Sequence, residues 1–96
     1  MAELSTIHRV KTFLRIKHSA LDEEIADQIE ACKADLGIVG VHNAAERDPT
    51  IIEAIKLWCK AHVTDDPDES AKWMSAYNAL KGTLKVAAGY GGTDAD

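Results

Sequence analysis

Aromatic residues are scarce in this chain of 96 residues, which contains one Phe, two Trp and two Tyr. Hydrophobic residues nevertheless make up 46% of the sequence, so any core must be built mainly from aliphatic side chains. This composition is typical of a globular protein rather than of a disordered chain. The length predicts one small domain that buries a modest core and has a thin margin of stability.

Cysteine is also rare, and long apolar runs are missing. The two cysteines, Cys32 and Cys59, are too few for a secreted disulfide scaffold and favour a reduced, cytosolic setting. No apolar run approaches the roughly 20 residues that cross a membrane. The N-terminus lacks the basic start and apolar middle of a signal peptide. We therefore expect a protein without a membrane partner, made and used in a cytoplasm or in something assembled there.

Basic residues are outnumbered by acidic ones, with 11 Lys and Arg against 16 Asp and Glu and a formal net charge of −5. A free-standing nucleic-acid binder usually presents a basic face, so this balance argues against such binding as the main role. The charges are segregated, however, because the first 18 residues are basic and residues 19–35 are strongly acidic. Such a chain can pair head-to-tail with copies of itself and close into a ring. The candidate subunit contacts of the basic segment are Arg9, Lys11 and Arg15.

The spacing of apolar residues predicts four helices, and therefore an all-α fold. Two of the helices follow an Asp-Pro pair, in which Asp caps the helix and Pro occupies its first position. Short connections favour a small antiparallel bundle over residues 1–88, followed by a flexible C-terminal tail over residues 89–96. The helices are expected over about Thr6 to Ile16, Leu21 to Leu36, Pro49 to His62 and Pro67 to Ala87 or Ala88, the third being the most buried.

The stretch ACKADLGIVGV, residues 31–41, raises the question of what covers its apolar side chains. Gly37 suits the left-handed position that ends a helix, so we expect Ile38 to pack back on the last helical turn. Val39 and Val41 have no such local partner. We expect a neighbouring copy of the chain to cover them, which makes both candidate subunit contacts.

Cys59 and His62 lie three positions apart in the third predicted helix and could share a metal ion. A zinc site needs three or four ligands, and the other candidates, Cys32, His18 and His42, lack ligand spacing. Both cysteines lie on apolar stripes, where burial makes a thiol unreactive. Glycine-rich elbows, phosphate loops and paired acidic motifs are also missing. We therefore expect no metal, no cofactor and no enzymatic activity.

The first two predicted helices could be mistaken for a DNA-binding helix-turn-helix. The second helix of that motif enters the major groove and needs hydrogen-bond donors. Here the second helix is acidic, and DNA phosphates would repel it. The basic first helix is then either a solvated face or a patch that meets an acidic partner.

The motifs of the chain, taken in order, resemble those of the head–tail connector proteins of long-tailed bacteriophages. These are small helical adaptor or head-completion proteins, often called DNA-packaging proteins. The likeness covers about residues 4–92. It comprises V-K-x-x-L-R-I at Val10–Ile16, D-x-E-I/L at Asp22–Ile25, an A-x-x-D-L ending with Gly in outline at residues 31–37, A-I-x-x-W/Y-C-K at Ala54–Lys60, and the stripe Trp73, Tyr77, Leu80 and Leu84.

The resemblance implies a structural protein of the virion neck, from a phage or prophage, that is assembled in the host cytoplasm. About twelve copies would form a homo-oligomeric ring that joins the portal to the downstream stopper or tail protein and extends the DNA channel. The C-terminal part of such proteins typically engages the portal, which makes Leu84 and Tyr90 candidate portal contacts. Tyr90 could equally fold back on its own bundle.

An acidic channel suits this role, because basic walls would bind phosphates and slow the DNA that passes through without specific binding. The second predicted helix supplies the candidate channel-facing acids. These candidate acids are Asp22, Glu23, Asp27 and Glu30.

The alternative function is a small helical protein-binding adaptor or regulator, with nucleic-acid contact through the basic first helix.

Overall fold

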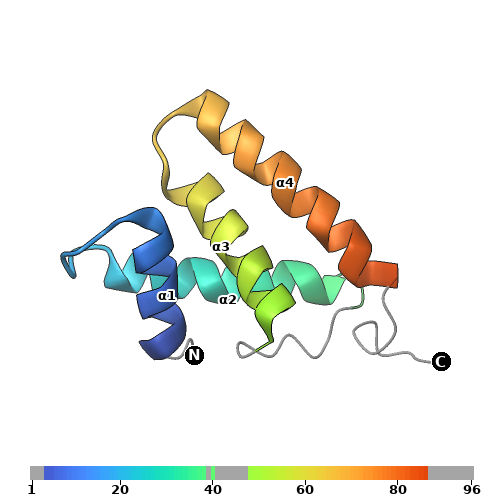
Figure 1. The fold of residues 1–96 in the computed structure, drawn as a ribbon, viewed down its shortest axis with the longest axis horizontal. Helices are drawn as coiled ribbons and strands as arrows, with labels where there is room; N and C mark the ends of the chain where they lie inside the picture. The colour runs from blue at the N-terminus through green and yellow to red at the C-terminus, as the bar shows by residue number, and fades with distance from the viewer. Residues whose placement is uncertain (1–3, 39, 41–47, 87–96) are drawn as a thin grey trace.

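The computed structural model describes residues 4–38, 40 and 48–86. These residues form four α-helices and no strand, which confirms the all-α prediction (Figure 1). The helices are α1 (Leu4–Leu14), α2 (Asp22–Ile38), α3 (Pro49–Val63) and α4 (Pro67–Val86).

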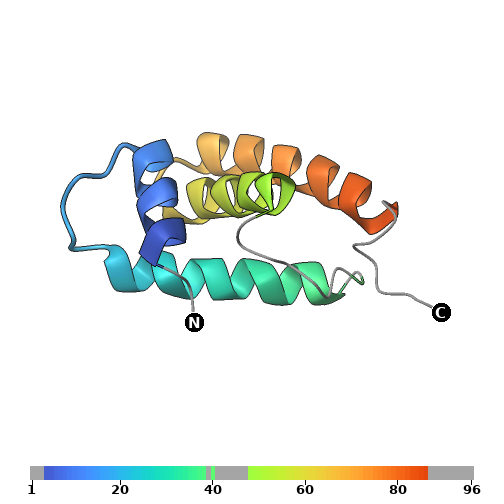
Figure 2. The ribbon, with the colours of Figure 1, turned by 60° about the horizontal axis from the view of Figure 1, so that its bottom comes forward.

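The helices form two layers. Figure 2 shows α2 along one side of the molecule and α1, α3 and α4 together along the other. Helix α3 crosses over α2, and α4 returns beside α3 in the opposite direction after a short connection (Figure 1). The antiparallel packing expected from the sequence is therefore found between α3 and α4, whereas α2 crosses beneath the other helices.

Both Asp-Pro pairs start helices as predicted. The Asp48 carboxylate accepts hydrogen bonds from the backbone N–H groups of Thr50 at 2.8 Å and Ile51 at 3.4 Å. Asp66 does the same at the start of α4 for the N–H groups two and three positions ahead, at 2.9 and 3.4 Å. These bonds satisfy N–H groups that have no partner within the first helical turn.

The core lies between the two layers and is centred on α3, which has seven buried residues. One core cluster contains the fully buried Ile25 and Ile29 of α2, Ile51 and Ile55 of α3, and Tyr77 of α4. The expectation that the third helix is the most buried is confirmed. His62, at the predicted end of this helix, is exposed.

The first helix ends at Leu14, two residues before the predicted end. Arg15 follows with φ 62°, in the left-handed region. Its N–H donates to the Thr12 carbonyl at 3.2 Å, and the N–H of Ile16 donates to the Lys11 carbonyl at 2.9 Å. This pair of bonds is a Schellman ending, built here around an arginine rather than a glycine.

The predicted end of the second helix is wrong. Helix α2 continues through Gly37 to Ile38, and the left-handed residue is Gly40, with φ 97°. The Gly40 N–H donates to the Gly37 carbonyl at 3.1 Å. Ile38 is 82% exposed and does not pack back on the last turn. Gly37 accepts helical geometry, and the left-handed conformation is found at the second glycine instead.

Candidate interaction surfaces

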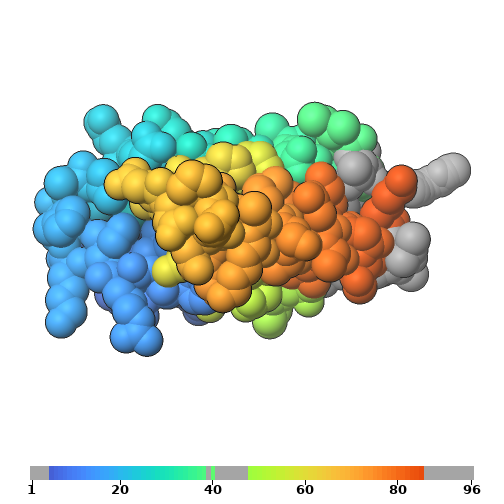
Figure 3. Space-filling view, turned by 90° about the horizontal axis from the view of Figure 1, so that it is seen from above, coloured from blue at the N-terminus to red at the C-terminus, as the bar shows by residue number. Residues whose placement is uncertain are grey.

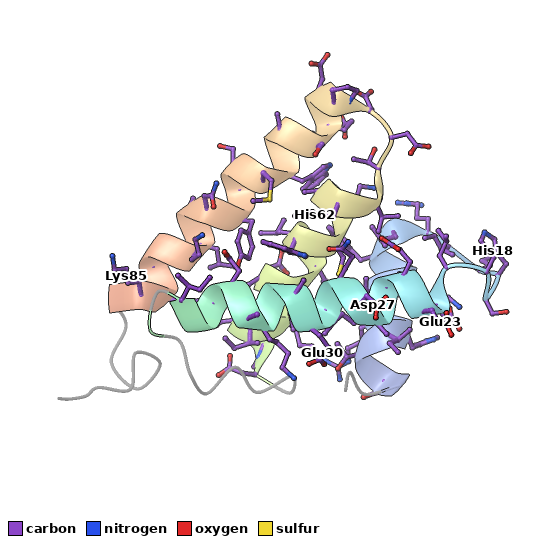
Figure 4. The ribbon with its side chains drawn as sticks, turned by 180° about the vertical axis from the view of Figure 1, so that it is seen from behind. His18, Glu23, Asp27, Glu30, His62 and Lys85 are labelled. Atoms are coloured by element: carbon purple, nitrogen blue, oxygen red, sulfur yellow. The ribbon has the colours of Figure 1, made fainter. Side chains whose placement is uncertain are left out.

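Three acids of α2 lie on the side of the helix that faces away from α3. Figure 4 shows Glu23, Asp27 and Glu30 along this outer side. Their spacing of four and three positions places them on one helical face. Glu23 and Asp27 are exposed. Glu30 is half-buried, and its carboxylate lies 3.6 Å from the Lys33 ammonium group. We call these three residues the α2 acidic stripe.

Asp22 differs from the other predicted channel-facing acids. Its carboxylate lies 2.8 Å from the Lys11 ammonium group, and this ion pair joins the start of α2 to α1. Both residues are partly buried. Asp22 was predicted to face the channel and Lys11 to contact a neighbouring copy. Their charges instead neutralise each other within one chain.

Cations of α1 and of the segment that follows it border an open groove of about 420 Å³. The groove lies on the outer side of α1 and continues into the connection to α2. Three cations surround it, and a histidine and a threonine contribute polar atoms. Arg9 is exposed outside this groove. The lining residues are His8, Lys11, Thr12, Arg15, Ile16 and Lys17.

The four remaining predicted contacts fall into two groups. Leu84 is 1% exposed and belongs to the core, because it completes the inner stripe of α4. Its side chain is therefore not on the surface where a portal could touch it. Val39, Val41 and Tyr90 lie outside the described residues.

A polar network that the sequence did not reveal joins α2 to α4. The Tyr77 hydroxyl donates to the Asp35 carboxylate at 2.7 Å, and the Lys81 ammonium donates to the same oxygen at 3.1 Å. The Cys32 thiol lies 3.9 Å from the Tyr77 hydroxyl and 4.0 Å from the carbonyl oxygen of Ala54 in α3. The network thus contacts three of the four helices.

The environment of this network fixes its protonation. Burial, followed by the neighbouring Cys32 and Asp35, raises the pKa of Tyr77 far above its usual range, so the hydroxyl remains a donor. Burial acts to raise the pKa of Asp35, but hydrogen bonds from Tyr77 and Lys81 outweigh it and the net shift is downward. Burial also raises the pKa of the Cys32 thiol to about 12. The network is a neutral phenol and thiol beside a carboxylate–ammonium pair, an arrangement that holds helices together.

Within the described residues, no three His, Cys, Asp or Glu side chains are grouped as metal ligands would be. Cys59 is buried, and burial raises the pKa of its thiol to about 12. His62 is exposed; its ring stacks on Trp58 with centroids 4.1 Å apart, and its Nδ1 lies 2.8 Å from the Trp58 carbonyl oxygen. The described helices also include none long and apolar enough to span a membrane.

A second surface that the sequence did not reveal combines two aromatic rings with three lysines. Phe13 of α1 meets Trp73 of α4 edge to face, with ring centroids 5.9 Å apart. The Lys56 ammonium lies 5.9 Å from the centre of the Phe13 ring, and those of Lys60 and Lys72 lie 5.7 and 5.0 Å from the Trp73 ring. These five residues form what we call the aromatic–lysine patch.

The patch was missed because its members are distributed over three helices. Lys56 and Lys60 are one helical turn apart on α3, where mainly apolar residues flank them in the sequence. Only the packing of α1 and α4 against α3 brings Phe13 and Trp73 to the same lysines. Such a juxtaposition leaves no signal at short sequence spacing.

Comparisons with known proteins agree with the motif-based identification. The family model described as phage connector protein matches residues 6–91, most of the chain. Neither the curated proteins nor the solved structures include a significant match. The order of the sequence motifs, the four-helix fold and the family match lead to the same conclusion: the chain belongs to the phage connector protein family.

Proposed function

We propose that this chain is a structural protein of the phage neck, whose copies form a ring that joins the portal to the stopper or tail and extends the DNA channel. The family match over residues 6–91 carries the proposal. Segregated charge supports the ring, because acidic and basic surfaces on one chain allow head-to-tail contacts between copies. The virion neck would then be the site of action.

The ends of α4 and of α2 adjoin residues that we propose make specific contacts in this ring. Helix α4 ends near the exposed Lys85, and the residues that follow it include Tyr90, the aromatic side chain proposed to reach the portal. Helix α2 ends in the exposed Ile38. In the proposed ring, a neighbouring copy covers the adjoining Val39 and Val41.

The channel wall is proposed to be acidic, so that DNA slides without being held by phosphate contacts. Glu23 and Asp27 are exposed and can serve this purpose if α2 faces the channel. The same acids can serve instead as a contact with the neighbouring copy. These two uses predict different effects of charge reversal on the association of copies.

Native mass spectrometry of the chain, alone and with the portal ring of the same phage, tests the proposal. We expect a closed species of about twelve copies, either free or bound to the portal. A chain that remains monomeric in both mixtures would contradict the neck function. A monomer alone that assembles on the portal would support it, because interfaces below about 1,000 Å² need such a template.

The groove on α1 favours a second candidate function, a protein-binding adaptor that contacts nucleic acid through its first helix. Arg15 and Lys17 border the groove, whereas the charge of Lys11 is already matched by Asp22. A titration with duplex DNA at low salt distinguishes the two functions. Tight binding with a steep salt dependence would favour the adaptor over the connector.

A further inference from the structure

The aromatic–lysine patch and the outer face of α2 lie on opposite sides of the molecule. Lys56 and Lys60 lie on the side of α3 away from α2, since the residues of α3 that contact α2 include Ala54 and Trp58 on the other side of the helix. In Figure 3, α2 follows one edge of the molecule, while α1 and the start of α3 follow the other. Two surfaces placed in this way can repeat head-to-tail from copy to copy.

The outer face of α2 has two parts. Its first half carries the α2 acidic stripe, and its second half carries the exposed Ala31, Ala34 and Ile38. Asp27, Ala31, Ala34 and Ile38 follow each other at steps of four, three and four positions, the spacing of a helix seam that packs against a partner. Ile38 is the large hydrophobic side chain that stands exposed among the described residues.

The aromatic–lysine patch complements this face in charge and in chemistry. Its three lysines are opposite in charge to Glu23 and Asp27, the exposed acids of the α2 acidic stripe, whereas Glu30 already lies beside Lys33. Its half-buried rings, Phe13 and Trp73, offer apolar area beside the cations. Small side chains such as Ala31 and Ala34 let a helix approach a partner surface closely. Acidic, small and apolar positions thus face basic and aromatic ones.

We propose that the aromatic–lysine patch of one copy binds the outer face of α2 of the next copy. This inference rests on the proposed ring and names the surfaces that build it. It assigns Glu23 and Asp27 to the contact between copies rather than to the channel wall. DNA is the less favoured occupant of the patch, because the chain as a whole is acidic and would repel the duplex.

The first experiment follows the backbone and indole NMR signals of the labelled full-length chain from micromolar to millimolar concentration at low salt. We expect concentration-dependent shifts at two places together, the outer face of α2 and the patch, with the Trp73 indole signal among them. The shifts should shrink when salt is added, because screening weakens contacts between exposed charges. Shifts confined to another surface, or their absence at millimolar concentration, would overturn the proposal.

Charge reversal supplies the second experiment. Lys56→Glu with Lys60→Glu makes the patch acidic, and Glu23→Lys with Asp27→Lys makes the α2 face basic. Each double variant should associate with itself at least tenfold more weakly than the original chain. The chain that carries all four changes restores opposite charges and should associate again. Failure of the fourfold variant to recover, with a melting temperature near that of the original, would contradict the pairing.

Two controls test whether the patch itself, and not another basic surface or a nucleic acid, makes this contact. Arg15→Glu with Lys17→Glu gives the same change of net charge at the groove of α1 and should leave the association intact. A loss of association in this control would place the contact at the groove and overturn the proposal. A titration of the original chain with duplex DNA that shifts the patch signals would also overturn it, by making the patch a nucleic-acid surface.

Assembly on the portal separates failure of this inference from failure of the neck function. If the original chain assembles on the portal and both double variants assemble equally well, the surfaces are wrong while the function stands. If the original chain itself does not assemble there, the function fails first. Impaired assembly of both double variants, with recovery in the fourfold variant, is the expected result.

Discussion

Tyr77 of α4 and Asp35 of α2 are joined by a 2.7 Å hydrogen bond although 42 positions separate them in the sequence. The phenol also meets Trp58 of α3 edge to face, with ring centroids 5.2 Å apart. One side chain therefore fills the core with its ring and connects two helices with its hydroxyl. The bond predicts a stability effect that a purely apolar residue would not have.

Tyr77→Phe keeps the ring and removes the hydroxyl that Asp35 accepts from. We expect a loss of about 1–2 kcal/mol in the free energy of unfolding, because a partly buried carboxylate loses one of its two donors. Urea denaturation followed by circular dichroism measures this loss. Asn78→Ala, at an exposed position on the same helix, is the matched control and should not destabilise the chain. An equal loss in both variants would show that the bond contributes nothing.

Stability should decline as the pH rises above 9. Burial raises the pKa of both Cys32 and Cys59 from 9.0 to about 12, so the unfolded chain releases these protons first. The stability that comes from neutral thiols is complete below pH 9 and is lost between pH 9 and 12. Each thiol contributes a slope of about 1.4 kcal/mol per pH unit in that range.

Cys59→Ala isolates one of these slopes. The variant is expected to be less stable at neutral pH, because it leaves a small space in the core. Between pH 9 and 12, however, its stability should fall more gradually than that of the original chain. Denaturation at a series of pH values gives both slopes, and parallel curves would exclude the buried thiol as their cause.

Arg15→Gly should stabilise the chain. Arg15 has φ 62°, a conformation that is unfavourable for a residue with a Cβ atom and easy for glycine. After the entropy that glycine adds to the unfolded chain, we expect a net gain of about 0.5–1 kcal/mol. Lys17→Gly, two residues later, lacks this compensation and should destabilise or leave stability unchanged. The melting temperatures of the two variants decide the matter.

Asp48→Ala removes the side chain that caps α3. Two N–H groups lose their acceptor, and we expect a loss of about 1 kcal/mol in unfolding free energy. Asp48→Asn keeps an acceptor oxygen and should retain most of the stability. If both substitutions cost the same, the negative charge at the helix start would be more important than the hydrogen bonds.

Val39→Asp combined with Val41→Asp tests the cover proposed for the residues after α2. We expect normal folding of the isolated chain and impaired assembly on the portal, since the charges would be placed against a neighbouring copy. Thermal unfolding measures the first property and native mass spectrometry the second. Unchanged folding together with unchanged assembly would remove both valines from the contact.

The sequence predicted those features whose causes are local. Helices α3 and α4 begin as expected because an Asp cap and a Pro at the first position are signals within one turn. The end of α2 was misjudged, since Gly37 and Gly40 are both able to leave a helix and only the packed structure decides between them. The same ambiguity did not arise at Arg15, where a left-handed arginine gives no signal in the sequence.

The candidate surfaces divide in the same way. Glu23, Asp27 and Glu30 could be assigned to one face because a helical repeat places them there. The ion pair of Asp22 with Lys11 depends instead on the packing of α1 against α2. Leu84 belongs to a stripe of aromatic and leucine residues on α4. The sequence does not say whether this stripe faces the core or the surface, because that depends on how α4 packs. The aromatic–lysine patch depends on contacts between three helices, such as that of Phe13 with Trp73, and no periodicity within one helix encodes it.

The bond between Asp35 and Tyr77 also has a consequence for the order of folding. Helices α3 and α4 are neighbours in the sequence and can pair after closing a short loop, whereas the network must bring α2 to α4 across 42 positions. Because closing the longer loop costs more conformational entropy, we expect this network to form after α3 and α4 have paired. A network that forms late is absent from the transition state. Its loss should therefore accelerate unfolding and leave the folding rate nearly unchanged.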